Sequence, residues 1–154
     1  MEKQHDILVK VENLVKWFPV KRWFFQKPLY VKAVDDVSFE IRRGETLGIV
    51  GESGCGKSTL LRTVLRLIEP TSGKITYDGV NITKMRRGEL RKMRKKMQIV
   101  FQDPYSALDG RLKVGYIIEE PLIISKAYKT KEERKARVAE LMELVGLDPS
   151  YVDR

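Results

Sequence analysis

The chain has 154 residues and a formal net charge of +9, with 42% apolar and 33% charged residues. This length suits one domain with its own core, and the composition is too apolar for a disordered protein. No apolar run approaches the roughly 20 residues of a membrane-spanning helix, and the N-terminus lacks the pattern of a secretion signal. The single cysteine excludes an internal disulfide and is typical of a reducing compartment. We therefore expect a protein that stays in the cytoplasm or reaches a membrane by docking.

Alternating apolar residues predict two half-buried strands in the first third of the chain. The first runs from Ile7 to about Pro19 and the second from Val37 to Ile41. A basic and aromatic loop over residues 21–30 separates them. After a turn at residues 43–45, Thr46–Val50 is an almost continuous apolar run, which is typical of a strand covered on both faces.

A helix is predicted directly after the following glycine-rich segment. Its apolar residues recur from Leu60 to Ile68, and Glu69-Pro70 is expected to end it, because proline disfavours helical geometry in the preceding residue. Asp78-Gly79 lies between two short apolar runs and is a strong signal for a two-residue hairpin.

Much of the positive charge lies in residues 84–96, where eight Lys or Arg residues accompany one acid, Glu89. Leu90, Met93 and Met97 recur at the spacing of one helical face, which predicts an amphipathic helix with a solvated basic side. A docking surface and a nucleic-acid site are the alternatives. We expect no nucleic-acid partner, since no aromatic side chains are interleaved for stacking.

The last part of the chain is predicted to be a strand followed by helices. Met97–Phe101 has the apolar run of a second buried strand. Further on, Thr130 and Glu133 have the spacing of a capping box at the start of a helix. Gly146 lies where a glycine commonly follows the end of a helix.

Residues 51–58 read Gly-Glu-Ser-Gly-Cys-Gly-Lys-Ser and match the P-loop pattern G-x-x-x-x-G-K-[ST]. Glycines let the backbone wrap around phosphate oxygens, and the following helix adds its positive N-terminal end. Lys57 would supply a charge to the outer phosphates, and the Ser58 hydroxyl would ligate Mg²⁺. The expected nucleotide-binding residues are Gly51, Ser53, Gly54, Cys55, Gly56, Lys57, Ser58 and Thr59. We assign Cys55 no redox role, and a glycine-rich turn without a ligand is the disfavoured alternative.

Residues 44–59 closely resemble the ABC-transporter ATPases of the oligopeptide/dipeptide import family, as do residues 33–39, 99–104 and 118–122. The resemblance implies an α/β fold of the P-loop NTPase, ABC ATPase type, which is incomplete here. It implies an N-terminal antiparallel β subdomain and the start of a helical subdomain. The chain would form the N-terminal part of one domain over residues 1–154. Residues 1–50 and 74–82 would be mainly β, and residues 51–70 would form the P-loop and its helix. Residues 97–104 would form the Q-loop strand, and residues 105–154 the start of the helical subdomain.

The resemblance also implies roles for two residues outside the P-loop. Gln102 would be the Q-loop glutamine, whose amide oxygen ligates Mg²⁺ or its water; a polar cap at the end of a strand is the alternative. An aromatic residue upstream of the P-loop would stack on adenine, which needs only a flat apolar face. Phe18 is best placed for this, with Trp17 and Tyr30 as alternatives and a plain core role for Phe18 also open.

By the same resemblance, the protein would use ATP and Mg²⁺ at the cytoplasmic face of the membrane, as a peripheral subunit. Its partners would be transmembrane permease subunits and a second ATP-binding subunit in a head-to-tail dimer. The transported substrate stays open among peptides, oligosaccharides and metal complexes.

The sequence contains no LSGGQ motif and no Walker B strand, and His5 lies too early to be the switch histidine. We therefore expect this chain to be the N-terminal part of a longer protein. The longer protein would be an ATPase, whereas this part would bind ATP more readily than it hydrolyses it. An unpaired Thr46–Val50 strand would favour self-association. The alternative functions are a small P-loop kinase and a non-catalytic module that binds nucleotide or nucleic acid.

Overall fold

A computed structural model describes residues 6–20, 29–103 and 108–154. They form two compact units, of which the first ends at Gln98 and the second begins at Ile99. His5, most of the predicted loop at 21–30 and the predicted boundary at 105 lie outside the described residues. Among the helices in the described part of the chain, none has the length and apolar character needed to cross a bilayer.

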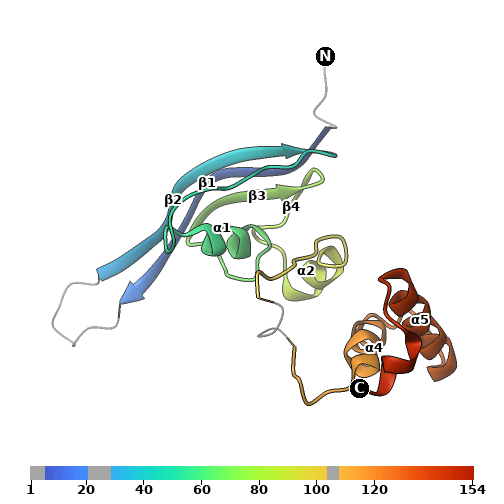
Figure 1. The fold of residues 1–154 in the computed structure, drawn as a ribbon. Coiled ribbons are helices and arrows are strands. Elements are labelled where there is room, and N and C mark those ends of the chain that lie inside the picture. Colours follow the sequence, from blue (N-terminus) through green and yellow to red (C-terminus); the bar gives the residue numbers. More distant parts are fainter. Residues whose placement is uncertain (1–5, 21–28, 104–107) are drawn as a thin grey trace. The chain divides into compact units, whose positions relative to one another are not determined.

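The first unit contains a four-stranded antiparallel sheet in the order β2-β1-β3-β4 (Figure 1). Its strands are β1 (Ile7–Val20), β2 (Leu29–Arg42), β3 (Ser72–Tyr77) and β4 (Val80–Asn81). Beyond the pair Val15–Ser72, β1 and β2 continue without β3 as a two-stranded ribbon, residues 16–20 and 29–34. The two predicted N-terminal strands are thus confirmed, and the second is longer than its apolar alternation indicated.

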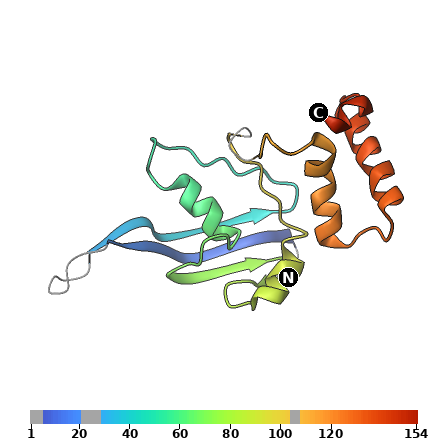
Figure 2. The same cartoon turned by 90° about the horizontal axis from the view of Figure 1, so that it is seen from below.

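Helix α1 (Lys57–Val64) lies against one face of this sheet, as Figures 1 and 2 show from two directions. Its Leu60 belongs to a buried apolar cluster that fixes the helix on the sheet; the other members are Val11, Leu14, Val34, Ile75 and Ile82. Burying each such side chain stabilises the fold by about 1.5–3 kcal/mol. Since this cluster includes residues of β1, β2 and β3, the sheet positions the segment that precedes α1.

Helix α1 ends at Val64, earlier than the predicted stop at Glu69-Pro70. Arg66 has φ of +53° and therefore cannot continue the helix. Its buried guanidinium donates hydrogen bonds to the carbonyl oxygens of Ile82 and Thr83. This tertiary contact stabilises a local conformation that the helical pattern of the sequence does not indicate.

The predicted hairpin and the basic helix are both present. Tyr77 pairs with Val80, and Asp78 and Gly79 have φ of +50° and +75°, as a type I′ turn requires. Helix α2 (Arg87–Met93) buries Leu90 and is shorter than the basic segment that contains it. Glu89 accepts a hydrogen bond from the Arg86 amide at its start (3.0 Å).

Two predicted buried strands are wrong. Residues 46–50 and 97–101 have no regular secondary structure. Ile49 packs against the core, but Val50 and Val100 are 94% and 95% exposed. A strand forms only where a neighbour pairs with its N–H and C=O groups. Within the described ranges no strand pairs with either segment, so residues 97–103 do not form the strand that was predicted for residues 97–104.

The second unit contains α4 (Val114–Ser125), α5 (Lys131–Leu144) and the 3₁₀ helix η2 (Pro149–Asp153). Helix α5 buries Val138 and Met142. Arg134 of α5 donates to Glu119 of α4 at 2.8 Å, in an ion pair that is largely shielded from water. These contacts make α4 and α5 one packed pair.

Both predicted ends of α5 are confirmed. The Thr130 hydroxyl accepts from the Glu133 amide, and the Glu133 carboxylate accepts from the Thr130 amide, each at 3.1 Å. At the other end Gly146 has φ of +76°. The amides of Gly146 and Leu147 donate to the carbonyl oxygens of Glu143 (2.9 Å) and Met142 (2.8 Å), which is the Schellman arrangement.

We expect Gly73→Ala to destabilise the first unit by more than about 1 kcal/mol. Gly73 has φ of +97°, and an added Cβ would lie 2.4 Å from the Asn13 carbonyl oxygen, which is part of the backbone and cannot rotate away. Gly88→Ala is the matched control, because it lies in α2 with no atom within 4 Å of the added Cβ. That change should be neutral or stabilising by up to about 1 kcal/mol. Urea unfolding of the two variants measures the difference, and equal midpoints would contradict the packing at Gly73.

The capping box of Thr130 and Glu133 at the start of α5 should make the stability of the fold depend on pH. Hydrogen bonds from the amides of Thr130 and Lys129 hold the pKa of Glu133 below its ordinary value of 4.5. A carboxyl group whose pKa is lower in the folded state than in the unfolded state stabilises the fold at pH values above its ordinary pKa. This contribution is lost as the pH falls through the pKa of the folded state. Glu133→Gln should therefore lower the thermal midpoint at pH 7, and the difference from the unmodified protein should shrink towards pH 3.

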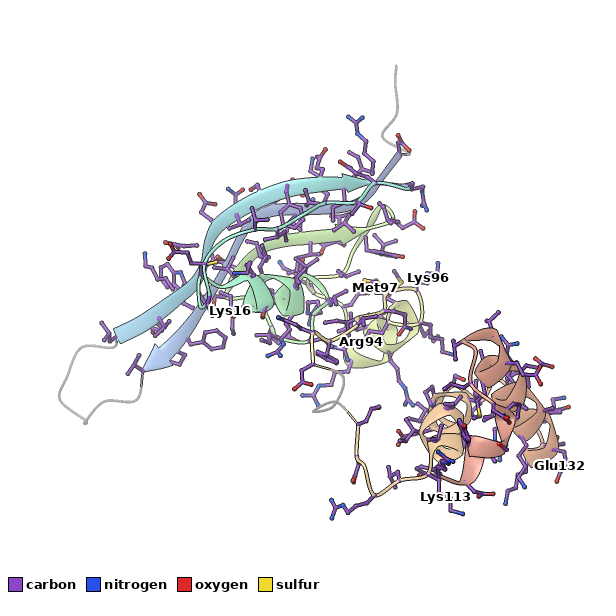
Figure 3. The ribbon with its side chains drawn as sticks, in the orientation of Figure 1. Lys16, Arg94, Lys96, Met97, Lys113 and Glu132 are labelled. Atoms are coloured by element: carbon purple, nitrogen blue, oxygen red, sulfur yellow. The ribbon has the colours of Figure 1, made fainter. Side chains whose placement is uncertain are left out.

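Glu132, in the same turn and labelled in Figure 3, provides the control for this prediction. The structure records no hydrogen bond to its carboxylate among the described residues. A pH-dependent difference as large in Glu132→Gln as in Glu133→Gln would show that the general charge of the helix start, and not the capping box, is responsible.

Candidate functional site

Residues 51–56 form a loop that leads directly into α1. Gly54 and Gly56 have φ of +82° and +100°, conformations that residues with a Cβ rarely adopt. Residues 51–55 are exposed to solvent. The sequence pattern of the P-loop therefore corresponds to a curved, accessible backbone at the beginning of a helix.

Gly56 brings this loop into contact with the sheet. A Cβ added at Gly56 would lie 2.1 Å from the carbonyl oxygen of Ala33 in β2, so only glycine permits the two backbones to approach so closely. Gly56 is also the N-cap residue of α1, and no side chain caps the first amides of the helix. The N–H groups of the first turn and the positive end of the helix dipole form an arrangement that favours an anion.

The Lys57 ammonium lies inside the loop. Its Nζ donates to the carbonyl oxygens of Gly51 (2.8 Å) and Glu52 (2.5 Å) and lies 3.5 Å from Cys55 Sγ. An ammonium group has three donors, and here all three point to atoms of the loop. The loop therefore encloses a positive charge that phosphate oxygens would meet on entering it.

The chemistry of Ser58 fits a magnesium ion bound together with phosphate. Ser58 is exposed on the first turn of α1, where its hydroxyl offers an oxygen atom. Mg²⁺ prefers oxygen ligands, commonly a few protein groups together with phosphates and water. Among the described residues, no group of three or more His, Cys, Asp or Glu side chains could hold a metal by itself. Ser58 could thus share a magnesium ion with the phosphates of a bound nucleotide.

Phe18 lies on the ribbon, paired with Val31, and is 36% exposed. Trp17 is otherwise engaged: its indole N–H donates to Asp35 (3.0 Å), and its ring centroid lies 6.1 Å from that of Tyr30. The two alternatives to Phe18 thus contact each other, while part of the Phe18 ring is open to solvent. Stacking of adenine on Phe18 remains a prediction, which this arrangement supports.

Gln102 belongs to the second unit, in an exposed bend. Its predicted role as a ligand of Mg²⁺ or its water remains a prediction. The remaining P-loop residues, Ser53 and Thr59, lie respectively in the exposed loop and in the first turn of α1.

Two residues of this region were missed by sequence reasoning. Nothing in the sequence indicates that the Ala33 backbone approaches Gly56, because the contact joins distant segments. Lys16 lies with its Nζ 4.9 Å from the centroid of the Phe18 ring. Strand alternation could have identified Lys16, since residues two apart in a strand lie on the same face.

Comparisons with known proteins agree with this geometry. The model of the family described as ABC transporter matches residues 34–153. The chain is 47% identical over 150 residues to a probable peptide ABC transporter ATP-binding protein of Sinorhizobium fredii, covering 97% of this chain and 42% of that protein. It is 47% identical over 152 residues to the dipeptide transport ATP-binding protein DppF of Haemophilus influenzae, covering 99% of this chain and 46% of that protein.

A solved structure shows the same fold. The ATP-binding cassette MJ0796, solved as a dimer in a post-hydrolysis state with ADP and Pi, matches with a TM-score of 0.75 and 28% identity. The match covers 96% of this chain and 61% of the cassette. The curated relatives are longer as well, and this chain spans less than half of their length. The expected fold is confirmed as the α/β fold of an ABC ATPase, present in part, with the antiparallel sheet and the first helices.

The family model, the curated relatives and the solved cassette all agree, and the family match covers well over half of the chain. It extends from Val34 in β2, through the P-loop and both units, to Asp153. The alternative of a small P-loop kinase finds no support in these comparisons. The relatives are named as ATP-binding proteins of peptide and dipeptide transport, and the chain itself belongs to the ABC transporter family.

Proposed function

We propose that this chain binds Mg-ATP, with the phosphates held by residues 51–59. The single observation that carries the proposal is the Lys57 ammonium inside a glycine-rich loop at the uncapped start of α1. Main-chain N–H groups, a helix dipole and one cation there act on the same small volume, and together they favour a polyanion such as a triphosphate.

In this proposal Ser58 holds Mg²⁺ together with phosphate oxygens, and Gln102 contacts the ion or its water. When bound, the ion would neutralise part of the negative charge of the phosphates. The residues of this chain position the phosphates: Lys57 provides the charge, and the backbone of Gly54 and Gly56 leaves room for them. Phe18 provides a surface for adenine at the other end of the nucleotide.

For the whole protein we propose the energy-coupling ATPase subunit of an importer of oligopeptides or dipeptides. The support is the similarity to relatives named for peptide, dipeptide and oligopeptide transport. ATP hydrolysis, transmembrane permease partners, head-to-tail pairing with a second ATP-binding subunit and a position at the cytoplasmic face of the membrane belong to this proposal. The proposed role of the P-loop is to bind the nucleotide, so the P-loop does not indicate which peptides are transported.

Lys57→Ala should weaken Mg-ATP binding at least roughly 10-fold, which corresponds to about 1.4 kcal/mol. The change removes the one cation enclosed by the loop, while the core around Leu60 is untouched. Titration by calorimetry, with thermal unfolding of the same samples, measures affinity and confirms the fold. The matched control is Lys84→Ala, an exposed lysine of the first unit and of equal charge, which should bind Mg-ATP as the unmodified protein does. Equal affinities for all three proteins would contradict the assigned role of Lys57.

A further inference from the structure

Two lysines of the ribbon each lie over an aromatic ring, one on each face. Lys16 Nζ is 4.9 Å from the centroid of the Phe18 ring, and Lys32 Nζ is 4.5 Å from that of the Trp17 ring. Phe18 and Trp17 are consecutive in β1, so their side chains point to opposite sides of the strand. The ribbon thus carries two similar cation–π pairs in different surroundings.

The Lys16–Phe18 pair lies on the face that α1 covers further along the sheet. Lys16 is directly across from Val34, and side chains of directly opposed residues share a face. Val34 is only 4% exposed and packs in the same cluster as Leu60 of α1. Figure 3 shows Lys16 on the side of the ribbon where α1 lies.

This face leads from the P-loop towards Phe18. Ala33, next to Val34, is the residue whose carbonyl oxygen touches Gly56. In β2, Ala33 lies between Val34, which pairs with Lys16, and Val31, which pairs with Phe18, so Gly56 touches the ribbon between the levels of Lys16 and Phe18. A base that extends from the loop to Phe18 would therefore reach a ring that Lys16 already contacts.

In the second pair, Lys32–Trp17, both side chains also contact a carboxylate. Asp35 accepts hydrogen bonds from the Trp17 indole (3.0 Å) and from Lys32 Nζ (3.2 Å), so the charge of Lys32 is neutralised locally. For Lys16 the structure records no ion pair with a carboxylate among the described residues, and its recorded contact is the Phe18 ring. In the described part of the chain, the recorded partner of the Lys16 cation is thus the Phe18 ring, whereas Lys32 is also held by Asp35.

We propose that Lys16 is a positioning residue for recognition of the adenine base. Its ammonium covers one face of the Phe18 ring and holds the ring in place, which leaves the other face for the base. A cation is attracted to the face of an aromatic ring, and a side chain that is already ordered loses less entropy when a ligand stacks on it. This inference rests on the proposed binding of nucleotide.

The test compares Lys16→Met, which keeps the length of the side chain and removes the charge, with Lys16→Arg, which keeps the charge. Each variant is titrated with Mg-ATP and with tripolyphosphate, which has no base. Lys16→Met should weaken Mg-ATP binding roughly 3- to 10-fold, and Lys16→Arg should restore it. Tripolyphosphate affinity should not change in either variant. Lys32→Met, the matched control on the opposite face, should leave both affinities unchanged.

A double variant shows whether Lys16 acts through the ring. In a Phe18→Ala background, Lys16→Met should have no further effect on Mg-ATP affinity, because the ring that it positions is gone. An equal loss of Mg-ATP and tripolyphosphate affinity in Lys16→Met would overturn the inference, since it would indicate a general effect on the phosphate loop. Loss in Lys32→Met as large as in Lys16→Met would overturn it as well.

The inference and the proposed function fail in different ways. If Mg-ATP binding depends on Lys57 but Lys16→Met binds as tightly as the unmodified protein, the role of Lys16 is wrong and the proposed function stands. If the unmodified protein binds no Mg-ATP, both are wrong.

Discussion

The close approach of Gly56 to the Ala33 carbonyl oxygen is the contact on which the candidate site depends. It allows the start of α1 to lie directly against β2, because an added Cβ at Gly56 would be 2.1 Å from that oxygen. The buried cluster around Leu60, Val34 and Ile75 then holds the helix in this position. The uncapped amides of the helix and the ribbon that carries Phe18 are consequently fixed within one unit, and a single ligand could contact both.

The chemistry of the site follows from this geometry and from one charge. Lys57 fills the loop with an ammonium group bonded to the carbonyl oxygens of Gly51 and Glu52, so the loop keeps its curvature around a cation. A phosphate would offer this cation stronger acceptors than neutral carbonyls. Lys16 on the neighbouring ribbon adds a second positive charge on the face that leads to Phe18. Base and phosphates would thus meet separate, preformed surfaces.

Local signals in the sequence predicted those parts of the fold that local interactions stabilise. Asp78-Gly79 forms its hairpin turn because the two residues accept positive φ, and Thr130 with Glu133 forms a complete capping box. The predictions from sequence were wrong where contacts between distant segments determine the local structure. Residues 46–50 and 97–101 are apolar enough for buried strands, but no strand in the described part of the chain pairs with them. The contact of Arg66 with Ile82 and Thr83 ends α1 early, and the approach of Ala33 to Gly56 likewise joins residues far apart in sequence.

The most direct test of the account is an experimental structure of the protein with a bound Mg-nucleotide. We predict phosphate oxygens within hydrogen-bonding distance of the main-chain amides at the start of α1. Lys57 Nζ should then lie on those oxygens, Ser58 on the metal ion and the base on Phe18. A nucleotide bound elsewhere, with the Lys57 ammonium still on the carbonyl oxygens of Gly51 and Glu52, would contradict the proposal that this loop is a triphosphate site.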